Sequence, residues 1–175
     1  MLTEFRGRGD EVHILPLSFS EYFPATNQSK EDAWRDYLLY GGMPHILSLK
    51  DDEQKVQYLN SLNKEIYLRD IQERYDVRNL TGMEELMKVI ASSVGSLTNP
   101  QKISDTFRSS GMKGISFPTI AEYLTYLQDA GLICRAERYD IKGRKYISTP
   151  MKYYYADTGL RNALLGFRQF EETHL

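Results

Sequence analysis

The chain has 175 residues and a formal net charge of −2, with 41% hydrophobic and 26% charged residues. This composition is typical of one large or two small folded domains and excludes a disordered chain. No apolar run reaches the roughly 18 residues of a membrane span, and the N-terminus lacks the apolar stretch of a signal peptide. The single cysteine, Cys134, excludes an internal disulfide. We therefore expect a cytoplasmic protein with no membrane partner.

Charge is unevenly distributed along the chain. Residues 1–98 contain 11 Lys or Arg against 16 Asp or Glu, whereas residues 99–155 contain 9 against 5. The basic middle segment could face phosphate, although the excess is modest. One cysteine and three scattered histidines do not supply a zinc site, and the Gly-rich phosphate loop of an ATPase is absent. The residues therefore indicate neither a metal nor a cofactor in this chain, and no self-contained catalytic site.

Short elements are predicted at the front of the chain. Residues 11–15 are rich in β-forming side chains and end at Pro16, which predicts a short strand ending near Leu15. Capping signals and helix breakers then predict three short helical segments: one after Ser18 that stops at Pro24, one from Ser29 to Gly41-Gly42, and one turn after Pro44.

A long amphipathic helix is predicted over residues 51–75, which contain no Gly or Pro and carry apolar residues at helical spacing. Glu65 precedes Arg69 by four positions, and Asp70 precedes Arg74 by four. Acid-before-base pairs at this spacing stabilise a helix. We therefore expect the outer face of this helix to carry two ion pairs.

The remaining elements are predicted from caps and breakers in chain order. They are a helix capped by Thr81-Gly-Met-Glu84 and ending at Gly95, a short helix from Asn99-Pro100 to Gly111, a helix from Ser116-Phe-Pro118 to Gly131, a hairpin over 132–156, and a helix that begins after Asp157 or Thr158 and ends at Gly166.

Residues 99–157 thus have the element order of a winged helix-turn-helix: a short helix, a turn, a longer helix and a two-stranded hairpin. In that fold the second helix reads the DNA groove and the hairpin tip contacts phosphate. Lys142, Arg144 and Lys145 give the tip its positive charge. These three residues are therefore candidate contacts to nucleic acid.

The candidate reading helix, Thr119 to Ala130, argues against base recognition. It contains Glu122 and Asp129 and no Lys or Arg, and acids repel phosphate. Its expected exposed face also includes Tyr123 and Tyr126. The alternative is a winged helix that packs on protein, with Tyr123 and Tyr126 as the contacts to another domain or partner.

Several motifs carry a family resemblance. The run from Gly7-Arg8 through Leu15-Pro-Leu-Ser-Phe-Ser-Glu-Tyr22 resembles the segment after the sensor strand in prokaryotic AAA+-type ATPases that carry a C-terminal domain of unknown function. Tyr40-Gly-Gly-Met-Pro44 is similar to the YGGxP motif of that family. The remaining resemblances are Tyr67-Leu-Arg-Asp-Ile71, Lys102-Ile-Ser-Asp105, Thr119 to Leu127, Tyr153-Tyr-Tyr-Ala-Asp157 and Gly159-Leu160.

The resemblance implies that this chain is a C-terminal piece of such an ATPase, without its phosphate loop and without the nuclease-like domain that usually follows. ATP and Mg²⁺ would then belong to the intact protein. At the matching position, Arg8 is a candidate nucleotide contact, with a surface arginine as the alternative. The implied organisation is an ATPase-core and lid remnant over 1–50, a helical linker pair over 51–98, a winged helix over 99–166, and a tail over 167–175.

Two functions remain open from the sequence. The first is a non-catalytic module that couples nucleotide state to a partner domain, a protein or nucleic acid. The second is a stand-alone DNA-binding winged-helix regulator, with residues 51–95 forming a homodimer. Weak, non-specific nucleic-acid binding fits either one. In both cases the fold class is mainly α with a small β component: a helical lid and linker segment followed by a winged helix-turn-helix.

Overall fold

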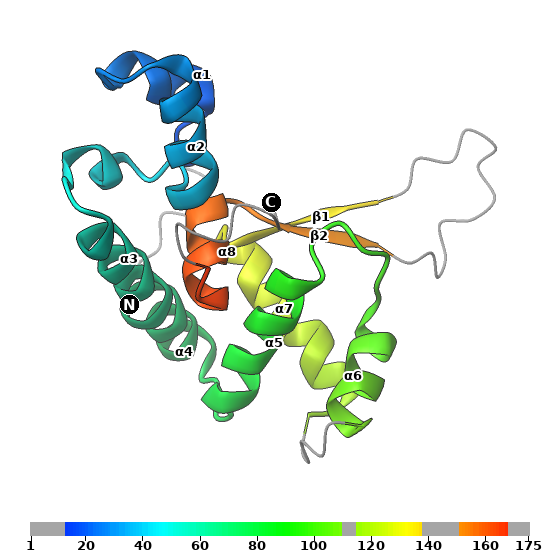
Figure 1. Ribbon diagram of the computed structural model, residues 1–175. Helices are drawn as coiled ribbons and strands as arrows, with labels where there is room; N and C mark the ends of the chain where they lie inside the picture. The colour runs from blue at the N-terminus through cyan, green and yellow to red at the C-terminus, as the bar shows by residue number, and fades with distance from the viewer. Residues whose placement is uncertain (1–12, 110–114, 138–150, 168–175) are drawn as a thin grey trace, which may run out of the picture.

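The computed structural model describes residues 13–109, 115–137 and 151–167 (Figure 1). Within these ranges the protein is mainly helical with one two-stranded antiparallel sheet, as the sequence predicted. The elements are α1 (Phe19–Tyr22), η1 (Phe23–Ala25), α2 (Lys30–Tyr40), η2 (Pro44–Ser48), α3 (Asp52–Ser61), η3 (Leu62–Leu68), α4 (Arg69–Tyr75), α5 (Leu80–Ser92), α6 (Pro100–Ser109), α7 (Phe117–Asp129), β1 (Ile133–Ala136), β2 (Lys152–Tyr155) and α8 (Thr158–Leu165).

The front of the chain contains the predicted helices but not the predicted strand. Ser18 forms the capping box of α1, and Ser29 caps α2 by accepting a hydrogen bond from the backbone N–H of Asp32 at 3.1 Å. Residues 13–15 are not in a strand, and the side chains of Ile14 and Leu15 are 90% and 73% exposed. The reason is that the described residues offer this segment no neighbouring strand. The β-forming composition alone does not supply a pairing edge.

The long helix predicted over residues 51–75 is present but changes character at its centre. Between α3 and α4, η3 is a π-helix, a rare form with a wider turn. The predicted Asp70–Arg74 ion pair forms at 2.7 Å. Arg69 instead binds Glu73 at 2.9 Å, so the predicted pairing with Glu65 is wrong. Glu65 lies inside the π-helix, where the four-residue spacing no longer aligns side chains as in an α-helix.

Helix α5 begins earlier than predicted. Its N-cap is Asn79, whose Oδ1 accepts a hydrogen bond from the N–H of Gly82 at 2.9 Å, and not a residue of the Thr81–Glu84 pattern. Asn is at least as good an N-cap as Thr. The helix ends at Ser92, and Gly95 follows in the turn with a φ of +74°.

The later elements follow the predicted order. The N–H of Lys102 donates to Asn99 Oδ1 (2.8 Å) at the start of α6, and Ser116 caps α7. Strand β1 pairs with β2 in antiparallel register, with Cys134 opposite Tyr154. An isolated antiparallel bridge joins Thr98, just before α6, to Met151, just before β2. The predicted end of α6 at Gly111 lies outside the described residues, and so does the predicted turn of the hairpin.

One hydrophobic core runs through the described part of the chain. It draws buried side chains from all three main segments expected from the sequence, including Ile46, Leu86 and Leu127. Figure 1 shows α8 beneath α2, with β1 and β2 leading away from it, so the C-terminal helix lies among the elements that contribute to this core. No helix among the described residues is both long and apolar enough to cross a bilayer.

Candidate functional site

The two motifs that carried much of the family resemblance meet in space. Asp157 caps α8 by accepting a hydrogen bond on Oδ1 from the N–H of Leu160 at 2.9 Å. Its other oxygen, Oδ2, accepts from the N–H of Gly42 at 2.7 Å, across 115 positions of sequence. We call this contact between residues 40–42 and 157–159 the Asp157 joint. It attaches the C-terminal end of α2 to the N-terminal end of α8.

Glycines make this close approach possible. Gly41 ends α2 with a φ of +76°, a conformation that favours glycine. A Cβ at Gly41 would collide with the carboxylate of Asp157, and a Cβ at Gly159 would collide with the backbone carbonyl of Tyr40. Residues with side chains would therefore force the two helix ends apart. The double glycine acts as a helix end, as the sequence suggested, and also as a surface for a carboxylate.

Asp157 is 4% exposed, so its charge is almost removed from water. Burial is the largest effect and raises the pKa of its carboxyl group, while backbone hydrogen bonds from Leu160, Gly42 and Gly159 act in the opposite direction. No Lys or Arg among the described residues forms an ion pair with it. Backbone amides therefore stabilise this buried carboxylate.

Side chains of α8 extend the joint along the end of α2. Asn162 Nδ2 donates to the backbone carbonyls of Leu38 and Leu39, both at 3.0 Å. Thr158 Oγ1 donates to the carbonyl of Tyr37 at 3.1 Å. The last carbonyls of a helix generally lack a partner within that helix. Here α8 supplies donors for Leu38 and Leu39, and a second donor for Tyr37, which also accepts from the N–H of Gly41 at 2.9 Å. These three hydrogen bonds hold the end of α2 against α8.

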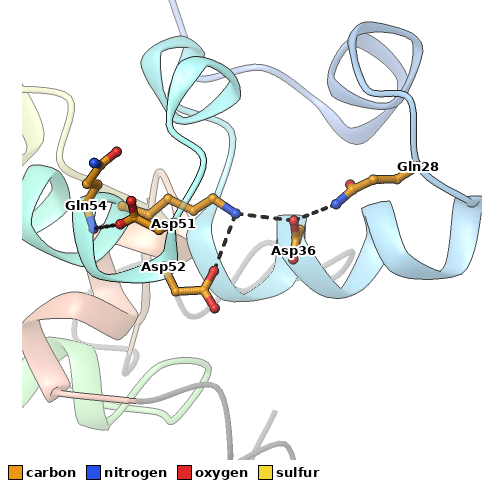
Figure 2. A network of polar contacts seen from close by, with 6 residues as sticks. Gln28, Asp36, Asp51, Asp52 and Gln54 are labelled. Atoms are coloured by element: carbon orange, nitrogen blue, oxygen red, sulfur yellow. Dashed lines mark hydrogen bonds and ion pairs between the residues drawn. The ribbon is translucent and has the colours of Figure 1, made fainter.

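A second polar contact holds the middle of α2 against α3 (Figure 2). The ammonium of Lys55 lies 3.4 Å from Asp36 and 3.6 Å from Asp52, and 4.5 Å from the ring centroid of Tyr40. Gln28 donates to the same Asp36 oxygen at 2.9 Å. We call this group the Lys55 cluster. It places a nearly buried cation between two carboxylates and an aromatic face.

Helix α8 is also attached to α5, and so is the hairpin that precedes it. Arg161 Nε donates to the carbonyl of Ala91 at 2.9 Å, near the end of α5. Tyr155, the last residue of β2, donates its hydroxyl to the carbonyl of Met87 at 2.8 Å. Only Ala156 separates β2 from Asp157. A continuous set of hydrogen-bonded elements thus runs from α2 through α8 to the hairpin and α5.

The predicted contact tyrosines of α7 face inward, contrary to the exposed face expected for them. Tyr123 is 5% exposed, and its hydroxyl lies 3.5 Å from the carbonyl of Asn79. Tyr126 is half-buried and stacks on Tyr75 of α4, with ring centroids 3.9 Å apart and an interplanar angle of 8°. Both tyrosines therefore contact the helical linker, residues 51–98, of this same chain. They lie on the buried, apolar face of α7, together with Ile120, Leu124 and Leu127.

The outward face of α7 carries no positive charge. Its exposed residues include Phe117, Glu122, Thr125 and Asp129. Asp129 accepts a hydrogen bond from the hydroxyl of Tyr75 at 3.1 Å. The other predicted contacts, Lys142, Arg144 and Lys145 at the hairpin tip and Arg8 near the N-terminus, lie outside the described residues. In the described ranges, no three His, Cys, Asp or Glu side chains are grouped as ligands for a metal ion.

Sequence reasoning identified Asp157 as a possible helix start but missed its partner. The sequence shows the two halves of this contact separately, as an acidic N-cap at Asp157 and a double glycine at Gly41-Gly42. Nothing in either motif says that they meet. Lys55 was also missed, because a lysine in an amphipathic helix with acidic neighbours normally lies on the solvated face.

Sequence comparison places these motifs in a family. Residues 31–171 match the profile of a family described as a domain of unknown function, DUF8612. The chain belongs to this family. The matched region includes both sides of the Asp157 joint and the whole Lys55 cluster except Gln28.

Two longer proteins are similar to this chain. An uncharacterized protein of Haemophilus influenzae is 36% identical over 171 residues, which cover 95% of this chain and 42% of that protein. An uncharacterized protein of Methanocaldococcus jannaschii is 28% identical over 177 residues, which cover 94% of this chain and 39% of that protein. The chain thus spans about two fifths of the length of these relatives. No solved structure matches it.

Proposed function

We propose that this chain is a non-catalytic module of an AAA+-like ATPase, which couples nucleotide state to a partner domain, a protein or nucleic acid. The observation that carries the proposal is the Asp157 joint, where Gly42 of the YGGxP-like motif donates directly to Asp157. A movement of the front segment would be passed through α2 to α8, and from there to the hairpin. The greater length of both relatives leaves room for an ATPase core.

The front of the chain carries an exposed apolar surface that suits such a role. Ile14 and Leu15 are largely exposed and precede Phe19 and Trp34, whose rings meet edge to face at 4.7 Å. Trp34 is itself 45% exposed. Exposed apolar groups of this kind often mark an interface. In the proposed arrangement, this front surface contacts the nucleotide-binding core of the longer protein.

The C-terminal half is proposed to be a winged helix. Two helices, α6 and α7, precede the β1–β2 hairpin, and the Thr98–Met151 bridge adds a second short pairing just before α6. This order of helices, bridge and hairpin is typical of that fold. Its α7, however, is fixed to α4 by the Tyr75–Tyr126 stack. The arrangement favours a winged helix that transmits movement within the protein.

Nucleotide binding by two purified proteins tests the coupling proposal. This chain contains no phosphate loop, so calorimetric titration with Mg-ATP should show a Kd weaker than about 1 mM. The longer H. influenzae relative should bind ATP and hydrolyse it. Micromolar binding by this chain, or no nucleotide binding by the relative, would overturn the proposal.

The runner-up function is DNA binding by a stand-alone regulator, favoured by the basic residues Lys142, Arg144 and Lys145, which follow β1 and precede β2 in the sequence. We expect weak duplex binding at low salt, with no strong sequence preference and loss near physiological salt. Replacing the three basic residues by Ala should abolish it. Because Tyr123 is buried, base reading is better tested with Thr125→Ala and Gln128→Ala. If these changes remove binding to one particular sequence at physiological salt, the regulator function replaces the coupling function.

A further inference from the structure

A pocket of about 270 Å³ lies where the π-helix η3 packs against α5 and α8. Its apolar lining comes from Leu68, Met87 and Leu164. Sites for drug-sized molecules usually measure about 300–1,000 Å³. This pocket is therefore of a size for a smaller ligand, and none of the functions considered above uses it.

Asn63 lines this pocket and is only half satisfied. Its Nδ2 donates to the backbone carbonyl of Leu160 at 2.9 Å, while its Oδ1 is buried with no hydrogen-bond partner. The orientation of the amide is fixed, because a carbonyl can only accept and so requires the NH₂ group on that side. Asn63 is 2% exposed overall. A buried acceptor in this state is costly unless a donor reaches it.

The backbone at this place is also unusual. Three lining residues, Asn63, Lys64 and Leu68, belong to η3. A π-helix is less stable than an α-helix and is retained most often at functional sites. The unsatisfied amide and the irregular helix are separate observations, and both occur at one wall of the same pocket.

Charged groups at the pocket define the chemistry it would accept. Lys64 of η3 and Lys88 of α5 are exposed lysines that line the pocket, and Glu84 of α5 also lines it. Lys88 also donates to Glu85 at 2.7 Å, which leaves two of its three N–H groups. Among the described residues, the lining contains no aromatic ring on which a nucleobase could stack. Two ammonium groups beside aliphatic side chains suit a carboxylate that carries an aliphatic group.

We propose that this pocket binds an aliphatic α-amino acid carboxylate, either as a free amino acid or as the C-terminal residue of a peptide. The carboxylate is held by Lys64 and Lys88, and the aliphatic side chain lies on Leu68, Met87 and Leu164. Glu84 distinguishes the two sources, because a free amino acid has an ammonium group to pair with it and a peptide has a neutral amide.

The methyl group of Met87 provides a direct reporter for the full chain. In protein labelled with [¹³C-methyl]methionine, the Met87 signal is assigned from Met87→Leu and followed during titration with L-leucine, N-acetyl-L-leucine and L-leucinamide. We expect a saturable shift of the Met87 signal with at least one of the two carboxylates and none with leucinamide. Tighter binding of L-leucine indicates a free amino acid, and tighter binding of N-acetyl-L-leucine indicates a peptide C-terminus.

Two matched double variants control for charge and folding. Lys64→Gln with Lys88→Gln should weaken carboxylate binding at least tenfold, whereas Lys30→Gln with Lys102→Gln removes the same charge elsewhere and should leave it unchanged. All four lysines are exposed, so both proteins should fold. The proposal is overturned if neither carboxylate shifts the Met87 signal at millimolar concentration, if leucinamide acts like the carboxylates, or if the Lys64/Lys88 variant binds normally. It does not depend on the coupling function.

Discussion

Two buried charges hold α2 in place, and they are stabilised in opposite ways. Asp157 is bound by backbone N–H groups and has no cationic partner among the described residues. Lys55 is bound by two carboxylates and the ring of Tyr40. Backbone donors cannot move away or be screened by salt, whereas Asp36 and Asp52 retain contact with solvent. The Asp157 joint should therefore contribute more to stability and respond less to salt than the Lys55 cluster.

The largest effect is expected for Asp157→Ala. This change leaves the buried N–H groups of Gly42 and Leu160 without an acceptor, and the loss of the buried charge offsets only part of the cost. We expect the free energy of unfolding to fall by about 3 kcal/mol in urea denaturation. Asp51→Ala is a matched control, because Asp51 also caps a helix but binds only the local N–H of Gln54. It should cost about 1 kcal/mol. Equal losses in the two variants would mean that the contact to Gly42 adds nothing.

The pH dependence of stability isolates the charge of Asp157. Its pKa is raised in the folded protein, so folding favours the protonated form of the group. Its contribution to stability is then fully present below the unfolded pKa of about 3.9 and is lost as the pH rises through the folded pKa. Relative to Asp157→Asn, the wild type should lose stability between these two pKa values as the pH rises. Urea unfolding of the wild type and of Asp157→Asn across that pH range measures the difference in their free energies of unfolding. If the wild type instead gains stability relative to Asp157→Asn as the pH rises, the prediction is wrong.

A smaller effect is expected for Lys55→Met, which keeps the length of the side chain and its apolar contacts. Asp36 and Asp52 can be rehydrated after the cation is removed, because both are partly exposed. We expect a loss of about 1 kcal/mol at low ionic strength, which shrinks in 1 M salt. Lys50→Met changes a lysine at an exposed position, so it should leave the free energy of unfolding unchanged both at low ionic strength and in 1 M salt. A loss as large as that of Asp157→Ala would contradict the proposed ranking of the two contacts.

The contrast between local and distant signals also explains what the sequence could predict. Ser18, Ser29 and Ser116 cap the helices they were expected to cap, because each cap involves residues within one turn. The N-cap of α5 was assigned wrongly because Asn79 and Thr81 are both competent, and packing decided between them. The strand at 11–15 needed a partner that composition does not reveal.

The candidate site depended on contacts that no local pattern contains. Asp157 and Gly42 are separated by 115 positions, and their meeting depends on how α2 and α8 pack. The π-helix was also unpredictable, since residues 51–75 have the periodicity of an ordinary amphipathic helix. Tyr123 and Tyr126 were correctly placed on α7, but their direction followed from the position of α4. Contact between elements, and not the elements themselves, was the information missing from the sequence.

The smallest effect is expected where α7 meets α4, a contact nearer the surface than either buried charge. Tyr75→Phe removes the hydroxyl that donates to Asp129 but keeps the ring stacked on Tyr126. Because Asp129 is exposed and can bind water instead, the loss should be about 0.5 kcal/mol. The stack itself is measured by a double-mutant cycle of Tyr75→Ala and Tyr126→Ala, with an expected coupling of about 1 kcal/mol. Zero coupling would show that α7 is not fixed to the linker, and movement could then not pass from α4 to α7 through this contact.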